Sequence, residues 1–236
     1  MKCIAIITAR GGSKRIPRKN IKDFCGKPII EYSIKAALES GVFDEVMVST
    51  DDEEIAEISM KAGAVVPFFR SSNTSDDYST TADVLMEVLK EYIKMGKTFD
   101  YAACIYPTAP FVTAQKLRDG IRILKEKDGI MLMPVVRFHF PPQRSLIIND
   151  GKVEYKWPQY RTTRSQDLEE MYYECGQYYF YNVDKYLEKK GQISEGIIPI
   201  IVSEMEAQDI DNEEDWRIAE FKYTIMNRMK IEEIFN

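Results

Sequence analysis

The feature that most constrains this chain is a short apolar strand that runs directly into a basic loop with two adjacent glycines. Residues 4–8 form a largely β-branched run that is long enough for one buried parallel strand. Gly11 and Gly12 follow, and glycines there would let the backbone take positive φ and approach a bulky group without a Cβ clash. Successive N–H groups in such a turn can form a concavity that binds an anion. The stretch therefore predicts a strand that ends at an anion site.

Positive charge is concentrated in the same loop. Residues 10–27 hold seven Lys or Arg against one acid, Asp23, although the whole chain carries a formal net charge of −6. This local excess favours a dedicated site for a small polyanion, and a solvated basic loop is the alternative. Two common phosphate loops are excluded. Gly26-Lys27 is followed by Pro28 instead of Ser or Thr, and no three spaced glycines form a dinucleotide fingerprint after the first strand.

Composition narrows the class of protein. A chain of 236 residues with 44% hydrophobic content can bury one core, which predicts a single α/β domain. The pI near 5.1 argues against nucleic acid as a partner, and the absence of an 18-residue apolar run argues against a membrane span. The four cysteines form no CxxC pair, so we expect free thiols in a reducing cytoplasm. His139 is the only histidine, which leaves little material for a His-rich metal site.

Apolar runs and helical stripes alternate along the first 136 residues. Strands are predicted at 2–8, 46–49, 65–69, 101–105 and 130–136. Helices are predicted at 29–40, 81–95 and 114–127, and another begins where Thr50-Asp51-Asp52-Glu53 has the capping-box pattern. The alternation predicts a three-layer α/β fold, with a mostly parallel sheet and helices on both faces. Residues 106–110 would lie at the carboxyl end of a strand, where open α/β sheets bind ligands.

The alternation breaks at Phe138. Residues 145–157 are typical of a hairpin that turns at Asn149-Asp150-Gly151, and residues 158–174 are polar and lack clear periodicity. Insertions of this kind are usually functional, so we expect residues 138–172 to form an arm that serves as a lid, a specificity loop or a contact to another subunit. Strands at 176–182 and 197–202 and a helix at 213–230 complete one domain over residues 1–236.

Two carboxylates, Asp209 and Asp211, follow the last apolar strand. Residues two apart on an extended segment point to the same side, so Ile210 between them should face the core. Hard oxygen ligands of this kind suit Mg²⁺ that is bound jointly by protein and substrate phosphates. The alternative is an ordinary turn and helix cap, with Asn212 and Asp215 as possible capping residues.

Residues 9–20 read A-R-G-G-S-K-R-I-P-R-K-N. This stretch resembles the A-R-G-G-S-K-x-x-P-x-K-N signature of the CMP-sialic acid synthetase family of cytidylyltransferases, and every fixed position of the signature is present. Residues 49–52 match the family's S-T-D-D element, and residues 209–215 match its D-I-D-x-x-x-D element. The last match favours Asp209 and Asp211 as metal ligands. The resemblance implies a nucleotide-diphospho-sugar transferase-like, Rossmann-like form of the α/β fold.

The resemblance also implies a nucleotide site around the basic loop. Arg10, Lys14 and Lys19 would contact the triphosphate, with the backbone of Gly11, Gly12 and Ser13 beneath it. Asn20 and Arg70 would help to place the cytosine and the nucleotide, and Thr80 or Thr81 would reach the ribose or the base. A surface salt bridge is the alternative for Arg70. The residues implied in catalysis are Arg10, Lys19, Asp209 and Asp211.

Residues 106–110 match the family's Q-P-T-S-P element at the mouth of the sugar pocket, with Tyr106 in place of Gln and Ala109 in place of Ser. A phenol in place of an amide should change which acyl or hydroxyl groups fit. The run Y-P-T-A-P-F at 106–111 is similar to the branch of the family that acts on pseudaminic acid. The sugar-binding residues implied in this way are Tyr106, Thr108, Gln177 and Tyr178. A buried aromatic strand is the alternative for residues 178–181.

The function implied by the resemblance is transfer of CMP from CTP to the anomeric hydroxyl of a nonulosonic acid, with release of pyrophosphate. Pseudaminic acid is the favoured acceptor, and sialic, legionaminic or 3-deoxy-manno-octulosonic acid are alternatives. A noncatalytic nucleotide-binding module is an alternative of a different class. The resemblance further implies Mg²⁺ as cofactor and a homodimer in which the arm reaches the neighbouring sugar site.

Overall fold

The computed structural model describes residues 1–75 and 78–235, and it centres on a seven-stranded mixed sheet with the order β11–β6–β10–β5–β1–β4. The seventh strand, β9, pairs with β6. These strands are β1 (Cys3–Thr8), β4 (Glu45–Ser49), β5 (Tyr101–Ile105), β6 (Met131–Arg137), β9 (Tyr172–Glu174), β10 (Tyr178–Asn182) and β11 (Ile197–Ile201). Strand β1 is parallel to both of its neighbours and β11 is parallel to β6, whereas β10 runs antiparallel between β5 and β6. Within the sheet only β9 and β10 run against the other strands, so the prediction of a mostly parallel sheet is confirmed.

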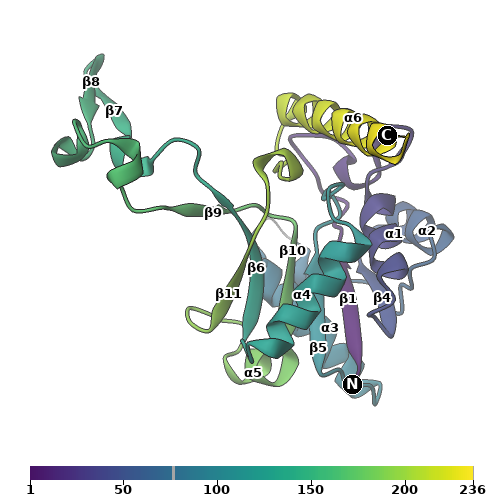
Figure 1. Ribbon diagram of the computed structural model, residues 1–236. Coiled ribbons are helices and arrows are strands. Elements are labelled where there is room, and N and C mark those ends of the chain that lie inside the picture. The colour runs from purple at the N-terminus through teal and green to yellow at the C-terminus, as the bar shows by residue number, and fades with distance from the viewer. Residues whose placement is uncertain (76–77, 236) are drawn as a thin grey trace.

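Helices cover both faces of the sheet because its strands alternate their side chains between two apolar clusters. Ala5 and Ile7 pack toward α1 (Ile30–Ser40) and α4 (Ala114–Glu126), with α2 (Glu53–Lys61) beside α1. Ile4 and Ile6 pack toward α3 (Thr81–Lys94) and α5 (Val183–Glu188) on the opposite face. The layers are visible in Figure 1. The three-layer arrangement expected from the sequence is therefore confirmed.

A third apolar cluster joins the two ends of the chain. Helix α6 (Glu213–Phe235) places Trp216 against Phe24, with the ring centroids 5.5 Å apart in an edge-to-face arrangement. Phe24 belongs to a short hairpin of β2 (Asp23–Phe24) and β3 (Lys27–Pro28) that follows the basic loop. Ile16 of the loop and Ile210 before the helix are buried in the same cluster. This packing brings the acidic segment at 209–211 next to the basic loop.

The predicted hairpin is present as β7 (Leu146–Asn149) and β8 (Lys152–Tyr155), and Figure 1 shows it projecting far from the sheet. Asp150 and Gly151 both take positive φ, as a two-residue hairpin turn of the I′ type requires. Every residue of the two strands is exposed. The hairpin therefore contributes nothing to the core of its own chain.

Two local predictions are wrong. Residues 65–69 do not form a strand, because only Val65 pairs, through an isolated bridge to Met47, and Pro67 has no N–H to extend a ladder. Thr50 does not cap α2. The helix begins at Glu53 with Asp52 as its N-cap, and buried Thr50 accepts a hydrogen bond from the Asp52 N–H instead.

Helix α5 was not predicted, since its six residues are too few to show helical periodicity. None of the helices in the described part of the chain is long and apolar enough to cross a membrane.

Candidate active site

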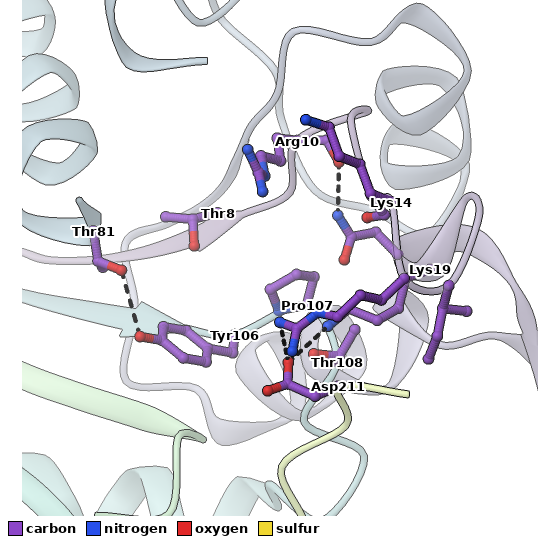
Figure 2. Close-up of a pocket in the computed structure, with 13 residues that line it drawn as sticks. Thr8, Arg10, Lys14, Lys19, Thr81, Tyr106, Pro107, Thr108 and Asp211 are labelled. Carbon is purple, nitrogen blue, oxygen red and sulfur yellow. Dashed lines mark hydrogen bonds and ion pairs between the residues drawn. The ribbon is translucent and has the colours of Figure 1, made fainter. Parts of the chain in front are cut away.

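A cavity of about 450 Å³ lies at the carboxyl ends of β1 and β5, where a ligand site is expected in an open α/β sheet. Figure 2 shows the basic side chains on one side of this cavity and Tyr106 with Thr81 on the other. The lining residues are Thr8, Arg10, Ser13, Lys14, Arg15, Ile16, Lys19, Asn20, Thr81, Tyr106, Pro107, Thr108 and Asp211. The structure thus gathers most of the predicted nucleotide residues together with two predicted sugar residues and one carboxylate.

Lys19 connects the basic loop to the acidic segment. Its Nζ donates a hydrogen bond to the Ile210 carbonyl oxygen at 2.6 Å and lies 4.0 Å from Asp211 Oδ1. Burial lowers the pKa of the Lys19 ammonium, and the two nearby carboxylates, Asp211 and Asp209, oppose that shift. The side chain is therefore a desolvated cation held at the edge of the cavity, where its interaction with an anion is stronger than in water.

Asn20 closes the basic loop on itself. Its side chain is buried, and its Nδ2 donates a hydrogen bond to the Arg10 carbonyl oxygen at 2.9 Å. This contact ties residue 20 of the loop to the backbone at its start. Part of Asn20 still lines the cavity, so the residue both shapes the loop and faces a ligand.

The two glycines act differently from the prediction. Neither Gly11 nor Gly12 takes positive φ. Gly11 is required for space, because a Cβ built there would lie 2.7 Å from Asp52 Oδ2, whereas nothing lies within 4 Å of a Cβ at Gly12. The Gly11 N–H donates to Asp51 Oδ1 at 2.8 Å, so this N–H is already engaged by a carboxylate. The start of the basic loop is thus packed against the residues that precede α2.

Arg18 completes that contact on the side away from the cavity. It takes a left-handed backbone conformation with φ of 55°, and its guanidinium pairs with Asp52 and Glu54. The Arg18 guanidinium beside Asp52 lowers the pKa of that carboxyl. The S-T-D-D element therefore anchors the basic loop through Asp51 and Asp52. Anchoring the basic loop is a role in addition to capping the helix, and the local sequence pattern did not predict it.

The two carboxylates of the acidic segment differ in their surroundings, because Asp211 lines two cavities and Asp209 lines one of them. Asp211 lines the main cavity, where Arg15 donates a hydrogen bond to it at 2.7 Å. Asp209 and Asp211 both line an adjoining cavity of about 420 Å³. Burial and, secondarily, the nearby Asp211 raise the pKa of Asp209. In the described part of the chain no cluster of three or more His, Cys, Asp or Glu side chains is arranged for a metal ion.

The capping alternative for the acidic pair is resolved by the hydrogen bonds. Asn212 Oδ1 accepts from the N–H groups of Glu214 and Asp215, and Asp215 Oδ2 accepts from the N–H groups of Asp211 and Asn212. These two residues cap α6. Ile210 is fully buried, as predicted. The carboxylates of Asp209 and Asp211 take no part in the cap, and the Asp211 carboxylate is instead paired with Arg15.

Tyr106 and Thr81 form the wall opposite the basic loop. The Tyr106 hydroxyl and Thr81 Oγ1 lie 3.4 Å apart at hydrogen-bonding distance. Burial raises the pKa of Tyr106, so the phenol is neutral near pH 7. Thr108 follows Pro107 in the rigid loop after β5. The wall thus offers neutral hydroxyl groups to a ligand, in contrast to the charged loop.

Several predicted site residues do not line the cavity. Arg70 is buried and donates from Nε and an Nη to Ser49, so the surface salt bridge considered for Arg70 is wrong. Thr80 is the N-cap of α3 within a capping box, and Thr81 faces the cavity in its place. Gln177 is buried with its Nε2 donating to the Glu206 carbonyl oxygen. Within this chain these three side chains support the fold around the site.

Tyr178 is the clearest correction among the sugar residues. Its side chain has no exposed surface, and its ring packs in the core with Phe180, at 6.1 Å between centroids, on the face covered by α4. The reason is the period of two along β10, which directs Tyr178 and Tyr179 to opposite faces of the sheet. The alternative of a buried aromatic strand holds for all of residues 178–181.

Four lining residues received no role from the sequence: Thr8, Arg15, Ile16 and Pro107. Thr8 ends β1, so the rule that ligands bind at the carboxyl ends of strands could have identified it. Arg15 belongs to the basic cluster, but its pairing with Asp211 joins residues that are 196 positions apart. A local sequence pattern cannot predict a contact between residues so far apart in the sequence.

Comparison with known proteins shows that this chain is similar to cytidylyltransferases. A family model described as cytidylyltransferase matches residues 4–190. The pseudaminic acid cytidylyltransferase of Campylobacter jejuni serotype O:2 is 37% identical over 95% of this chain and 97% of its own length. The CMP-N,N′-diacetyllegionaminic acid synthase of Legionella pneumophila is 32% identical over 93% and 95%. Among solved structures, a CMP:2-keto-3-deoxy-manno-octonic acid synthetase complexed with CTP has a similar fold, with a TM-score of 0.69, 17% identity, and coverage of 97% of this chain and 100% of its own.

Proposed function

Because this chain belongs to the cytidylyltransferase family, we propose that it transfers CMP from CTP to the anomeric hydroxyl of a nonulosonic acid, with pseudaminic acid as the acceptor. The observation that carries the proposal is the main cavity itself. One wall holds the cationic side chains of Arg10, Lys14 and Lys19, and the opposite wall holds the neutral hydroxyls of Tyr106 and Thr81. A triphosphate suits the first wall and a polyhydroxylated sugar suits the second.

The reaction needs position and charge stabilisation more than covalent chemistry. The anomeric hydroxyl oxygen attacks the α-phosphorus and gives up its proton to solvent, a new P–O bond forms, and the bond from the α-phosphorus to the bridging oxygen breaks to release pyrophosphate. Arg10 and Lys19 stabilise the negative charge that moves onto the leaving pyrophosphate. Holding both substrates in one cavity converts a bimolecular step into an effectively unimolecular one. The half-buried Lys19 is well suited to this role, since its partly desolvated ammonium interacts more strongly with an anion than it would in water.

Mg²⁺ is the proposed cofactor, held by Asp209 and Asp211 together with phosphate oxygens of CTP. Burial is the main cause of the raised pKa of Asp209, and repulsion by the nearby Asp211 carboxylate adds to it; a divalent cation would relieve that repulsion. Two protein oxygens and several substrate oxygens are the ligand set that Mg²⁺ prefers in nucleotide enzymes. When bound, such an ion stabilises negative charge on phosphate oxygens.

The acceptor assignment rests on the similarity to enzymes named for pseudaminic acid and on Tyr106, which occupies the position where the family signature has Gln. The test is a pyrophosphate-release panel that crosses the four nucleoside triphosphates with pseudaminic, legionaminic, sialic and 3-deoxy-manno-octulosonic acids. We expect CTP with pseudaminic acid to give the highest turnover. Equal or better turnover with another acid would overturn the acceptor assignment, and nucleotide binding without pyrophosphate release from any pair would favour a noncatalytic binding module.

We also propose a homodimer in which the arm reaches the neighbouring chain, and a cytoplasmic location. The arm exposes Ile148, Val153 and Phe140, with 75%, 61% and 63% of their surfaces accessible, which a second subunit would cover. All four cysteines lack disulfide partners, which fits a reducing compartment.

A further inference from the structure

A buried serine of α1 connects that helix to one wall of the main cavity. Ser33 has no exposed surface, and its Oγ donates a hydrogen bond to the Tyr106 carbonyl oxygen at 2.7 Å. A serine inside a helix usually donates to a carbonyl oxygen of the preceding turn, as Ser59 of α2 does to Ile55 at 2.6 Å. Because a hydroxyl has one proton to donate, Ser33 uses it for a contact between elements instead.

The backbone of Tyr106 is held from two sides. Its carbonyl oxygen accepts from Ser33, and its N–H donates to the Gln177 carbonyl oxygen at 2.9 Å, next to the start of β10. Residue 106 also precedes Pro107, which disfavours a helical backbone at that position. These constraints together fix the backbone from which the Tyr106 side chain enters the main cavity.

Helix α1 is itself tied to the side of the molecule that carries the basic loop. The Ile29 N–H, at the start of the helix, donates to the Lys22 carbonyl oxygen at 3.1 Å. The hydroxyl of Tyr32, in the first turn, donates to the Phe24 carbonyl oxygen at 2.7 Å. The first turn of α1 is therefore bonded both to the segment that follows the basic loop and, through Ser33, to the opposite wall.

We propose that Ser33 is a positioning residue that sets the distance between Tyr106 and the basic loop, and thereby the place of the acceptor sugar relative to CTP. The inference deepens the proposed function and rests on it. Attack on the α-phosphorus requires the reacting atoms to be held about 3–3.5 Å apart and in line, so a small shift of one wall lowers the rate. Ser33 does not line the main cavity, so its effect must pass through Tyr106.

The test compares Ser33→Ala with a matched control, Ser59→Ala. Both serines are fully buried in helices and donate to a backbone carbonyl, but the Ser59 bond stays within its own helix. Loss of one neutral hydrogen bond should lower kcat/KM for pseudaminic acid about two- to tenfold in Ser33→Ala. The Kd of CTP, measured by calorimetry without sugar, should stay at the wild-type value, and Ser59→Ala should change neither constant.

Two further variants separate positioning from a loss of stability. Ser33→Cys keeps a weak donor in nearly the same shape, so its kcat/KM should lie between those of the wild type and Ser33→Ala. It also takes the place of Ser33→Ala in the comparison if thermal melting shows that the alanine variant is unfolded. In a Tyr106→Phe background, Ser33→Ala should have a smaller effect, because the hydroxyl that Ser33 positions is then absent.

The results that overturn the inference differ from those that overturn the function. Equal kcat/KM for Ser33→Ala and Ser59→Ala, a matching loss of CTP affinity, or fully additive effects with Tyr106→Phe would each exclude positioning through Tyr106. A folded wild-type enzyme that releases no pyrophosphate with any nonulosonic acid would remove the proposed function and this inference together.

Discussion

Two residues of the basic loop, Arg10 and Lys19, line the cavity in which we propose that CTP binds, and their neighbour Lys22 does not line it. Lys19 is half-buried and bonded to the backbone of residue 210, whereas Lys22 pairs with Glu213 and lies over the Trp216 ring, 4.6 Å from its centroid. The same stretch of sequence therefore contains cations of two kinds, which differ in whether they line the cavity.

The first prediction uses this difference. Hydrogen bonds to charged groups are worth about 1.5–3 kcal/mol, so Arg10→Ala or Lys19→Ala should lower kcat/KM for CTP roughly ten- to over a hundredfold. Lys22→Ala is the control and should keep kcat/KM close to the wild-type value. Steady-state pyrophosphate release measures the constants. If a folded Lys19→Ala enzyme matches the wild type, the loop does not hold the triphosphate.

The second prediction concerns Asp209 and Asp211. Their change to Asn preserves volume and removes the charge that a hard cation requires, so each variant should need much more Mg²⁺ for half-maximal activity and should have a lower maximum rate. Because Asn212 and Asp215 form the cap, these two changes should leave the melting temperature nearly unaltered. Mg²⁺ titrations of activity, paired with thermal melts, give both readouts.

Asp215→Ala is the matched control for the acidic pair. It removes a cap and should cost about 0.5–2 kcal/mol of stability, with the Mg²⁺ requirement unchanged. Superimposable Mg²⁺ titrations for the wild type, Asp209→Asn and Asp211→Asn would place any metal site of this protein elsewhere.

At the scale of elements, the basic loop depends on the N-terminus of α2. Asp51 accepts the Gly11 N–H, and Asp52 both caps α2 and pairs with Arg18. A methyl group at residue 11 would collide with Asp52, at 2.7 Å from its Oδ2 and 3.0 Å from its Cβ. The basic loop and the N-terminus of α2 are thus held together by these contacts, so a change in one should disturb the other.

The third prediction tests the contact between the basic loop and Asp52 with the two adjacent glycines. Gly11→Ala forces Asp52 to move, so it should destabilise the protein by about 1–3 kcal/mol, as overpacking usually does. Gly12→Ala meets nothing within 4 Å and has no positive φ to lose, so its melting temperature should equal that of the wild type. Thermal unfolding measures both. Equal melting temperatures for the two variants would contradict the anchoring of the loop on Asp52.

At the scale of the whole molecule, the hairpin of the arm, β7 and β8, is not packed against the core of its own chain. Its two strands are exposed along their whole length and project away from the sheet in Figure 1. Isolated two-stranded hairpins are marginally stable in water, so a partner surface is needed to hold this one. We propose that a second copy of the chain provides that surface.

The fourth prediction follows from the arm. The wild-type protein should have twice the mass of the 27.4-kDa chain in light scattering, and Ile148→Asp with Val153→Asp should shift it to the monomer. Ile93→Asp, at an exposed apolar residue of α3, is the control and should remain a dimer. A wild-type enzyme that is monomeric and fully active at every assay concentration would refute the dimer.

Much of the architecture follows from local pattern alone. The strand and basic loop at the start of the chain, the βα alternation, the hairpin turn at Asp150-Gly151 and the burial of Ile210 were all predicted and are present. Each depends on periodicity, turn chemistry or a signature that lies within a few consecutive residues. The one failed strand, at residues 65–69, contains a proline whose effect depends on whether a neighbouring strand needs its N–H.

The candidate site was decided by contacts between residues far apart in sequence. Lys19 donates a hydrogen bond to the carbonyl oxygen of residue 210, and a Cβ at residue 11 would clash with Asp52. Tyr178 is buried, whereas Tyr106 faces the cavity. A sequence states which residues can donate, accept or carry charge, and the period of a strand limits which can share a face. Whether an aromatic side chain lies in the core or at the cavity depends on where β10 inserts between β5 and β6, and only the packed sheet determines that.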